Sequence, residues 1–428
     1  MKAAFYTLGC KVNQYDTQEM ISSLKANGFE IVDSKDDADI YIINSCTVTA
    51  ESSRKSRQAA RRYRKMHPGS IIVITGCYTQ AFSDEFQDFS DVDIVLGNNS
   101  NDELIDEIKN FTVTKKQIIK IKPHKLKDKY STSNITSFDG HTRAFVKIQD
   151  GCNRYCSYCI IPKSRGFSRS RPLREIEREL CTLNQLGYKE IVFVGINLSS
   201  YGQDIGGTIC DVIETAEKFN NIERIRLGSL EPDHITDDVI DRLSKIKKFC
   251  PQFHLSLQSG SDRILKRMNR HYTADEYYRL CQKLKQNFSD ISITTDIIVG
   301  FPGETEEDFN DTIKFCKKCR FMKVHVFPFS PRKGTPAYGY TDKINNAVKA
   351  ERCSILQNEC DSIRLDILNE YIGTKKSVLF ESPKGNSQQG YTENYTPVIV
   401  NSPADLCGKI TEVRIIDASC EECIAELL

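Results

Sequence analysis

Three cysteines lie close together in the segment from Gly151 to Cys159, where Cys152, Cys156 and Cys159 have the spacing C-x3-C-x2-C. Three thiolates from one loop can bind three irons of a cubane cluster, and the fourth iron then keeps an open coordination position. A structural zinc site needs four protein ligands, and this loop contains no fourth Cys or His. The spacing therefore favours a [4Fe-4S] cluster that accepts a further ligand at its open iron.

S-adenosylmethionine can chelate such an iron through its amino and carboxylate groups. This places the sulfonium where one electron from the cluster releases a 5′-deoxyadenosyl radical. A primary carbon radical can attack C–H bonds on which acid-base catalysis has no hold. We therefore expect no catalytic acid or base, and we expect the chemistry to occur at the clusters.

Three further cysteines, Cys10, Cys46 and Cys77, each follow a short apolar run. Those runs, residues 3–8, 40–43 and 71–75, alternate with helical patterns over 16–27 and 52–66. This βαβαβ order predicts a parallel sheet, whose strands end at one edge. One such cysteine is usually a small buried hydrophobic residue. All three at equivalent strand ends predict a second ligand set.

The loop with Cys152 follows the first of six strand-like segments separated by helical patterns. The six are residues 144–148, 190–194, 224–227, 253–257, 291–299 and 323–327. They predict a partial (β/α)6 barrel, with its chemistry in the loops that follow the strands. Short runs over 377–380, 396–400 and 410–416 then predict a small β-barrel.

The expected fold class is α/β with three domains. They are an N-terminal parallel-sheet domain (1–125), a partial barrel (139–370) and a C-terminal β-barrel (371–428). The lysine-rich residues 115–139 have little periodicity and are expected to form a linker.

The composition is that of an ordinary globular protein, with 39% hydrophobic and 27% charged residues among 428. The N-terminal residues do not resemble a signal peptide, and no run of apolar residues is long enough to span a membrane. We therefore expect a cytoplasmic protein without a membrane partner. In that reducing compartment, 17 cysteines indicate metal or redox chemistry rather than disulfides.

Two C-x2-C pairs stand outside these patterns, Cys316 with Cys319 and Cys420 with Cys423. Together they can form a four-cysteine zinc site. Because the two pairs fall in different predicted domains, free thiols are the favoured interpretation.

Six stretches resemble the radical S-adenosylmethionine methylthiotransferases, and more narrowly the bacterial enzymes that act on N6-threonylcarbamoyladenosine in tRNA. They are TLGCKVNQYDT (7–17), CSYCIIPKSRG (156–166), GINLSSYG (195–202), RLGSLEP (226–232), FHLSLQSGSD (253–262) and TDIIVGFPGET (295–305). These stretches are spread over about three-quarters of the chain.

The resemblance implies that Cys10, Cys46 and Cys77 bind a second [4Fe-4S] cluster with one open iron, which holds or carries sulfur. It also implies that a turn at Gly300, Phe301, Pro302 and Gly303 presents backbone to the adenine of S-adenosylmethionine. From strand position, Gly195 and Asn197 are expected near the methionyl amino group. Ser256, Gln258 and Asp296 are expected to face the barrel lumen, where each can equally well be a structural residue.

The implied reaction uses two S-adenosylmethionine molecules, one for the methyl group and one for the radical. It converts carbon 2 of the modified adenine beside the tRNA anticodon to a 2-methylthio group. The implied partners are the tRNA anticodon loop, a sulfur donor, and an electron donor such as flavodoxin or ferredoxin.

Three basic runs, residues 54–65, 115–129 and 163–174, favour an RNA substrate. The last barrel resembles the TRAM domain of RNA-modifying enzymes, although residues 396–428 have an acidic balance that is unexpected for an RNA face.

Two other functions remain open. One is a sister methylthiotransferase that acts on isopentenyladenosine in tRNA or on a ribosomal protein. The other is a non-catalytic iron-sulfur scaffold that binds RNA. Lys11, Val12 and Asn13 after Cys10 favour the threonylcarbamoyl branch.

Overall fold

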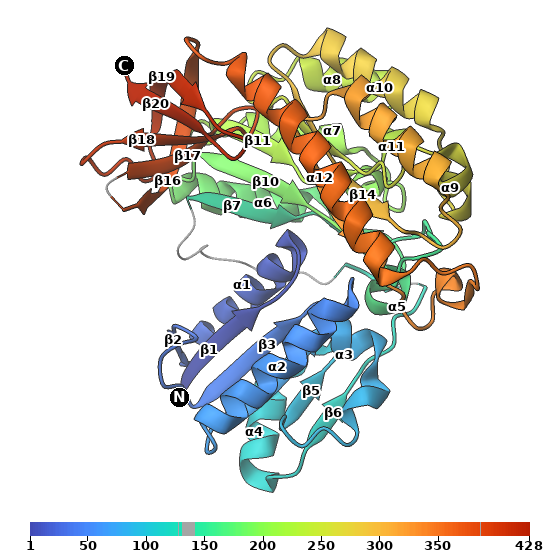
Figure 1. Cartoon of the computed structure of the whole chain (residues 1–428). Helices are drawn as coiled ribbons and strands as arrows, with labels where there is room; N and C mark the ends of the chain where they lie inside the picture. Colours follow the sequence, from blue (N-terminus) through green and yellow to red (C-terminus); the bar gives the residue numbers. More distant parts are fainter. Residues whose placement is uncertain (127, 131–141, 386) are drawn as a thin grey trace.

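The computed structural model describes residues 1–126, 128–130, 142–385 and 387–428. Along the chain, a parallel-sheet unit is followed by a larger α/β unit and then by a small β-barrel (Figure 1). In the part of the chain that the structure describes, no helix has both the length and the apolar character to cross a bilayer.

The first unit is a six-stranded sheet with the order β2-β1-β3-β4-β5-β6, in which every neighbouring pair is parallel. The strands are β1 (Lys2–Thr7), β2 (Glu30–Val32), β3 (Ile40–Ser45), β4 (Ile71–Gly76), β5 (Ile94–Leu96) and β6 (Ile118–Lys120). The helices are α1 (Lys11–Ala26), α2 (Ala50–Met66), α3 (Cys77–Ala81) and α4 (Leu104–Thr114). Strands β3 and β4 are buried at every residue, because helices cover both faces of the sheet. The predicted βαβαβ order is confirmed.

The expected linker is partly wrong. Within residues 115–139, the strand β6 pairs with β5 and forms the edge of the first sheet. Its three residues are too few to show periodicity, so the lysines around them dominated the pattern. Residues 127 and 131–139 of the predicted linker lie outside the described residues.

The second unit is an open barrel of parallel strands in two sheets, β11-β10-β7 and β12-β13-β14-β15, joined by a bridge between Ile225 and Phe249. The strands are β7 (Arg143–Lys147), β10 (Glu190–Val194), β11 (Arg224–Leu227), β12 (Ser229–Leu230), β13 (Gln252–Leu255), β14 (Ser292–Val299) and β15 (Lys323–Pro328). The short pair β8 (Gln149–Asp150) and β9 (Arg169–Ser170) lies beyond β7. All six predicted strand positions are confirmed to within two residues.

Helices surround this barrel. They are α5 (Ile161–Arg165), α6 (Leu173–Gln185), α7 (Ile209–Glu217), α8 (Asp237–Ser244), α9 (Asp262–Arg267), α10 (Ala274–Asn287), α11 (Glu306–Cys319) and α12 (Asn346–Asn369). The main hydrophobic core lies between the strands and these helices. The long helix α12 packs on β15 and reaches the last unit (Figure 1).

The last unit is a closed barrel with the order β16-β17-β18-β20-β19. Its strands are β16 (Lys375–Lys384), β17 (Ser387–Thr392), β18 (Pro397–Asn401), β19 (Ile410–Ala418) and β20 (Cys423–Leu427). The three predicted strands are present. Strands β17 and β20 were missed because SQQGYT is polar and CIAEL lies in the acidic C-terminal stretch.

Two buried arginines of β11 hold the closed barrel against the open one. Arg224 donates to the carbonyl oxygens of Tyr391 (3.0 Å) and Ser377 (2.9 Å). Arg226 donates to the carbonyl oxygen of Thr392 (2.7 Å) and is paired with the buried Glu190 (2.8 Å). Charged donors thus satisfy backbone acceptors that this interface removes from water.

Replacing Arg224 with alanine leaves those carbonyl oxygens without donors in a buried interface. We expect Arg224→Ala to lower the free energy of unfolding by about 2 to 3 kcal/mol in urea titration. As a control, Lys189→Ala removes an exposed ion pair with Glu223 and should cost less than about 1 kcal/mol. Equal effects of the two substitutions would contradict a role for Arg224 in docking.

Candidate functional site

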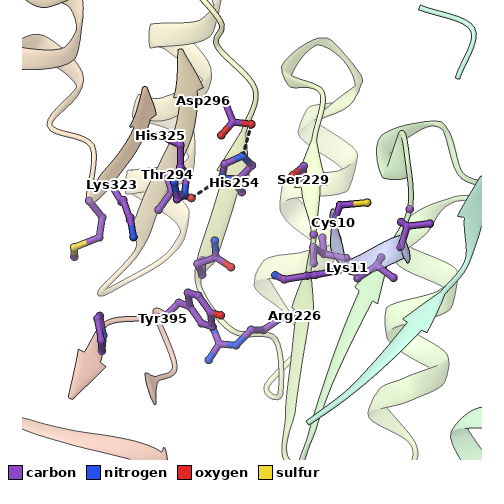
Figure 2. A pocket seen from close by; sticks show the side chains of 18 of the residues that line it. Cys10, Lys11, Arg226, Ser229, His254, Thr294, Asp296, Lys323, His325 and Tyr395 are labelled. Atoms are coloured by element: carbon purple, nitrogen blue, oxygen red, sulfur yellow. Dashed lines mark hydrogen bonds and ion pairs between the residues drawn. The ribbon is translucent and has the colours of Figure 1, made fainter. Parts of the chain in front are cut away.

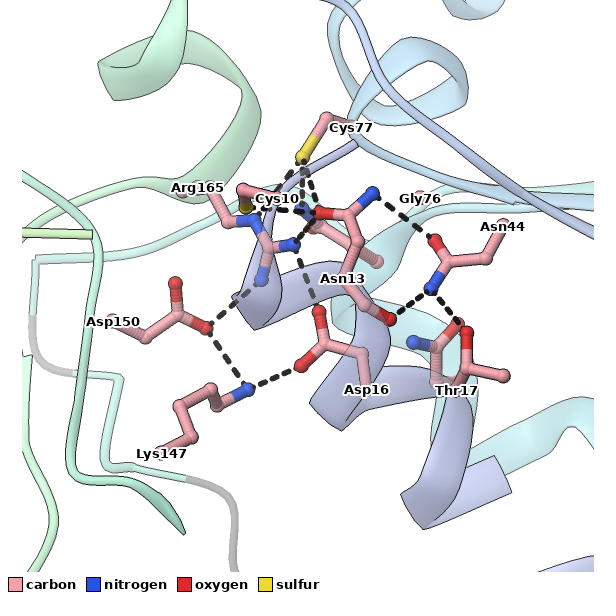
Figure 3. Close-up of polar contacts among 12 residues, drawn as sticks. Cys10, Asn13, Asp16, Thr17, Asn44, Gly76, Cys77, Lys147, Asp150 and Arg165 are labelled. Atoms are coloured by element: carbon pink, nitrogen blue, oxygen red, sulfur yellow. Dashed lines mark hydrogen bonds and ion pairs between the residues drawn. The ribbon is translucent and has the colours of Figure 1, made fainter. Parts of the chain in front are cut away.

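The three N-terminal cysteines come together at the carboxyl edge of the first sheet, as predicted, and Figure 3 shows two of them, Cys10 and Cys77. Cys10 caps α1, Cys46 follows β3, and Cys77 is the first residue of α3. The Sγ atoms of Cys10 and Cys77 lie 3.7 and 3.9 Å from one oxygen, Oδ1 of Asn13. A Cβ atom at Gly9 would lie 2.9 Å from the Cβ atom of Cys46, so the backbone before Cys10 is in close contact with Cys46.

Asn13 holds this edge together. Its Nδ2 donates to the carbonyl oxygens of Leu8 (2.9 Å) and Ser45 (3.0 Å), which belong to the segments that end at Cys10 and Cys46. Because both segments bond to one side chain, the spacing between the two cysteines is set before any metal binds.

Arg165 enters this edge from the second unit, at the end of α5, and its side chain is buried (Figure 3). Its Nε donates to Cys77 Sγ (3.1 Å), and one terminal nitrogen lies 2.8 Å from both Asn13 Oδ1 and Asp16 Oδ2. The other terminal nitrogen lies 3.4 Å from Asp150 Oδ2. One guanidinium therefore contacts a cysteine of the first unit and an acid of the second.

Lys147 completes the charge network between the units. Its Nζ lies 2.5 Å from Asp16 Oδ1 and 3.5 Å from Asp150 Oδ2. Burial opposes ionisation of Asp150, but Arg165, Lys147 and Arg169 together hold its pKa well below the usual range. Asp16 and Asp150 thus share the positive charges of Arg165, Lys147 and Arg169. This buried network is stable only while every partner is present.

The donor set at this edge fits an iron-sulfur cluster. Burial raises the pKa of Cys77 to about 12, against the opposing effect of Arg165, and burial also raises the pKa of Cys10. Metal binding must therefore displace protons from these thiols. The N–H group of Arg165 directed at Cys77 is the kind of donor that stabilises a cluster thiolate.

The second cysteine set lies in the loop after β8. The backbone N–H of Arg154 donates to Cys152 Sγ (3.4 Å), and Arg270 donates to Cys156 Sγ (3.3 Å). Burial raises the pKa of Cys152 to about 11 and also raises that of Cys159. Three partly or fully buried thiols with two directed N–H donors fit a three-cysteine cluster loop.

The residues expected to contact S-adenosylmethionine lie after β10 and β13, on β14, and in the turn after β14. Gly195 and Asp296 line a cavity that the open barrel shares with the other two units. Asn197 is buried, and its Oδ1 has no hydrogen-bond partner among the described residues. The carbonyl oxygen of Ser256 accepts from Arg270 (2.9 Å), the same side chain that contacts Cys156. The contacts of Arg270 place the end of β13 near the cluster loop.

The turn from Gly300 to Gly303 packs on the cluster loop through Phe301, whose ring centroid lies 6.5 Å from that of Tyr158. Gly300 has φ +67°, and a Cβ atom there would meet Lys349 at 2.4 Å, so only glycine fits. Gln258 adopts φ +74° in the isolated bridge to β14. No contact in the described structure relates Pro302 or the side chain of Gln258 to the cysteines.

A cavity of about 450 Å³ lies where all three units meet (Figure 2). Cys10 and Lys11 line it from the first unit, Asp296 and His254 from the open barrel, and Tyr395 from the closed barrel. His254 Nε2 lies 3.2 Å from Asp296 Oδ2, and the imidazole of His325, on β15, lies close to both side chains. A group bound here would lie beside one cysteine of the first set.

The sequence did not predict Lys11, Asn13, Arg165 or Arg270 as site residues. Arg165 belongs to a basic run that was interpreted as an RNA-binding surface, whereas the side chain points inward. Lys11 and Asn13 lie in the TLGCKVNQYDT stretch, so their position beside Cys10 was a usable signal. Arg270 carries no local signal, because only the fold brings it to Cys156.

The two C-x2-C pairs do not form a joint zinc site. Cys316 and Cys319 lie buried on α11, where they neighbour Cys360 and Cys281. Among the described residues, no cluster of His, Cys, Asp and Glu at zinc-binding spacing includes them or the pair Cys420 and Cys423. The favoured interpretation as free thiols agrees with this arrangement.

Removing Arg165 leaves Asp16 and Asp150 buried without their main cation. We expect Arg165→Ala to lower the free energy of unfolding by about 3 to 5 kcal/mol in anaerobic urea titration. Arg54→Ala, which breaks an exposed pair with Glu51, should cost less than about 1 kcal/mol. An Arg165→Ala protein as stable as the parent would refute the bridging role.

Gly151 allows the cluster loop to turn directly before Cys152. It has φ +73°, and a Cβ atom there would lie 2.0 Å from the carbonyl oxygen of Phe167. Gly187 has a similar φ of +81° with open space around it. We expect Gly151→Ala to lose the iron of this loop, while Gly187→Ala causes only backbone strain of about 1 to 2 kcal/mol. Iron analysis after anaerobic reconstitution tests this, and full loading of Gly151→Ala would contradict it.

Comparison with known proteins agrees with this geometry. Residues 146–316 match the Radical SAM superfamily, and residues 2–97 match the Uncharacterized protein family UPF0004. The chain is 37% identical over 424 residues to the threonylcarbamoyladenosine tRNA methylthiotransferase MtaB of Bacillus subtilis. The match covers 97% of this chain and 94% of that protein. It is 34% identical to the tRNA-2-methylthio-N(6)-dimethylallyladenosine synthase of Clostridium botulinum, over 96% of this chain and 94% of that protein.

Among solved structures, the fold is similar to the radical S-adenosylmethionine methyltransferase TsrM from Kitasatospora setae. The TM-score is 0.58 at 12% identity, and the match covers 90% of this chain and 81% of that one. The Radical SAM match implies a [4Fe-4S] cluster and S-adenosylmethionine as cofactors. From these relatives and its own cysteine geometry, the chain belongs to the radical S-adenosylmethionine tRNA methylthiotransferases.

Proposed function

We propose that the protein converts N6-threonylcarbamoyladenosine beside the tRNA anticodon to its 2-methylthio derivative. The observation that carries the proposal is the cavity lined by Cys10 on one side and by the open barrel on the other. An adenine bound between them would lie beside Cys10 and against the strand ends of the open barrel. The 37% identity over nearly the whole chain to an enzyme named for this substrate supports the choice.

In this proposal Cys152, Cys156 and Cys159 hold the cluster that binds S-adenosylmethionine. Cys10, Cys46 and Cys77 hold the second cluster. When bound, these groups supply the radical and the methylated sulfur. The chain itself positions them: Arg165 and Asn13 orient the first-unit cysteines, and Arg270 and Asn269 brace the barrel loop. Gly195, Asn197, Ser256, Gln258, Asp296, Gly300, Pro302 and Gly303 are the proposed S-adenosylmethionine contacts.

The basic runs support RNA binding less than their composition suggests. In the run from 54 to 65, Arg54, Arg57, Arg61 and Arg64 are paired with acids of their own unit. In the run from 163 to 174, Arg165 and Arg171 are buried in ion pairs. Lys55 and Lys65 have no ion pair among the described residues and are candidates for phosphate contacts. Lys55 also lines a larger cavity of about 1120 Å³ together with Cys10 and Cys46.

The remaining partners follow from the chemistry. Reductive cleavage requires an electron donor such as flavodoxin or ferredoxin, and repeated turnover requires a sulfur donor. Both the clusters and the absence of a disulfide among the cysteines of the described residues favour the reducing cytoplasm as the working compartment.

Nucleoside analysis of tRNA tests the substrate. In a strain without this gene, we expect N6-threonylcarbamoyladenosine to persist and its 2-methylthio derivative to disappear, as measured by mass spectrometry. The parent gene should restore the product, and a Cys10→Ala, Cys46→Ala, Cys77→Ala variant should not. The purified triple variant should bind about four irons per chain instead of about eight.

The sister activity on isopentenyladenosine is favoured by the 34% identical relative that is named for it. Loss of 2-methylthio-isopentenyladenosine in the same strain, with the threonylcarbamoyl product intact, would replace the proposal with that activity. Failure of reconstituted protein to form 5′-deoxyadenosine would support the non-catalytic scaffold.

A further inference from the structure

The cavity between the three units has a positive lining. Of the residues that line it, Lys11, Arg226, Lys323 and Arg364 are basic, and Asp296 is the only acid. Asp296 is already paired with His254. Basic side chains therefore outnumber acids in the lining, which is the character of a site for an anionic ligand.

Lys11 and Lys323 are the two cations of this lining whose side chains have no hydrogen bond or ion pair among the described residues, and Lys11 is the one that follows Cys10. Arg226 is occupied by Glu190 and by backbone carbonyl oxygens, and Arg364 donates to the carbonyl oxygen of Glu421. Among the described residues, the Nζ atom of Lys11 has no hydrogen bond or ion pair, and it lies over the ring of Tyr395, 5.8 Å from the centroid. A half-buried ammonium of this kind gains most from a ligand carboxylate.

The position of Lys11 links this charge to the reacting centre. It is the residue after Cys10, and its side chain extends from Cys10 across the cavity toward Tyr395 and Arg226 (Figure 2). The ring of Tyr395 is held in place by stacking on Tyr391 (4.6 Å) and by Arg143 (4.9 Å). An anion bound at Lys11 would lie beside the sulfur site and against a fixed aromatic wall.

We infer that Lys11 binds the carboxylate of the threonylcarbamoyl group and is thereby the residue that selects this substrate. The inference rests on the proposed function. The threonyl part carries a free carboxylate, whereas an unmodified or isopentenyl-substituted adenine carries no charge at that position. The cavity volume of about 450 Å³ is within the range of small-ligand pockets, about 300 to 1,000 Å³.

Binding of synthetic anticodon stem-loops to anaerobically reconstituted protein tests the inference. Three stem-loops are compared: one with N6-threonylcarbamoyladenosine, one with its carboxylate methyl ester, and one with unmodified adenosine. We expect the parent protein to bind the first about tenfold or more tightly than the ester. This comparison alters only the ligand, so it does not depend on whether a variant folds.

Two substitutions of Lys11 and one control substitution then test whether Lys11 causes the preference for the acid. Lys11→Gln should bind the acid and the ester equally, whereas Lys11→Arg, which keeps the charge, should retain the preference for the acid. Lys218→Gln removes an equal charge from the exposed end of α7, outside the cavity, and should keep the preference as well. Iron content and thermal unfolding report whether each variant is folded and loaded.

The outcomes separate the inference from the proposed function. Equal binding of the acid and the ester by the parent protein, or a preference that survives in Lys11→Gln, overturns the role of Lys11. If the parent protein methylthiolates isopentenyladenosine and not the threonylcarbamoyl substrate, the proposed function itself fails. If it modifies the threonylcarbamoyl substrate while Lys11→Gln still prefers the acid, only the inference fails.

Discussion

The arrangement of both cysteine sets depends on one buried guanidinium. Arg165 follows the barrel cysteine loop in sequence, yet it donates to Cys77 at the edge of the first sheet and contacts Asp16 there. On its own side it meets Asp150, which directly precedes the turn into that loop. The contact fixes the distance between the two ligand sets, because a buried ion pair cannot be stretched without leaving charges unpaired.

Buried arginine side chains also hold the closed barrel against the open barrel. Buried arginines of β11 donate to backbone carbonyl oxygens of β16 and β17, and the turn after β17 brings Tyr395 to the central cavity. The acidic balance of the last 33 residues therefore does not conflict with a role for this barrel, because its contribution to the cavity is an aromatic wall positioned by arginines of the neighbouring unit. A substrate bound in the cavity would touch all three units at once.

Local sequence patterns predicted what depends on local periodicity. The parallel order of the first sheet, the six barrel strands and the position of the cluster loop all follow from apolar runs and cysteine spacing. The edge strand β6 and the barrel strands β17 and β20 were missed because each is short or polar and forms only by pairing with its neighbours. Arg165 and Arg270 were missed for a different reason. Long-range packing decides whether an arginine points outward to solvent or inward to a thiolate, and no spacing rule encodes that choice.

We propose that the two three-cysteine sites hold separate clusters, and Arg165 links them through its contacts with Cys77 and Asp150. Electron paramagnetic resonance of the anaerobically reconstituted and reduced protein tests it most directly. The account predicts a spectrum broadened by coupling between two paramagnetic clusters, which simplifies to one isolated cluster when Cys10, Cys46 and Cys77 are replaced. A parent spectrum that already shows one isolated cluster, unchanged by those replacements, would contradict it.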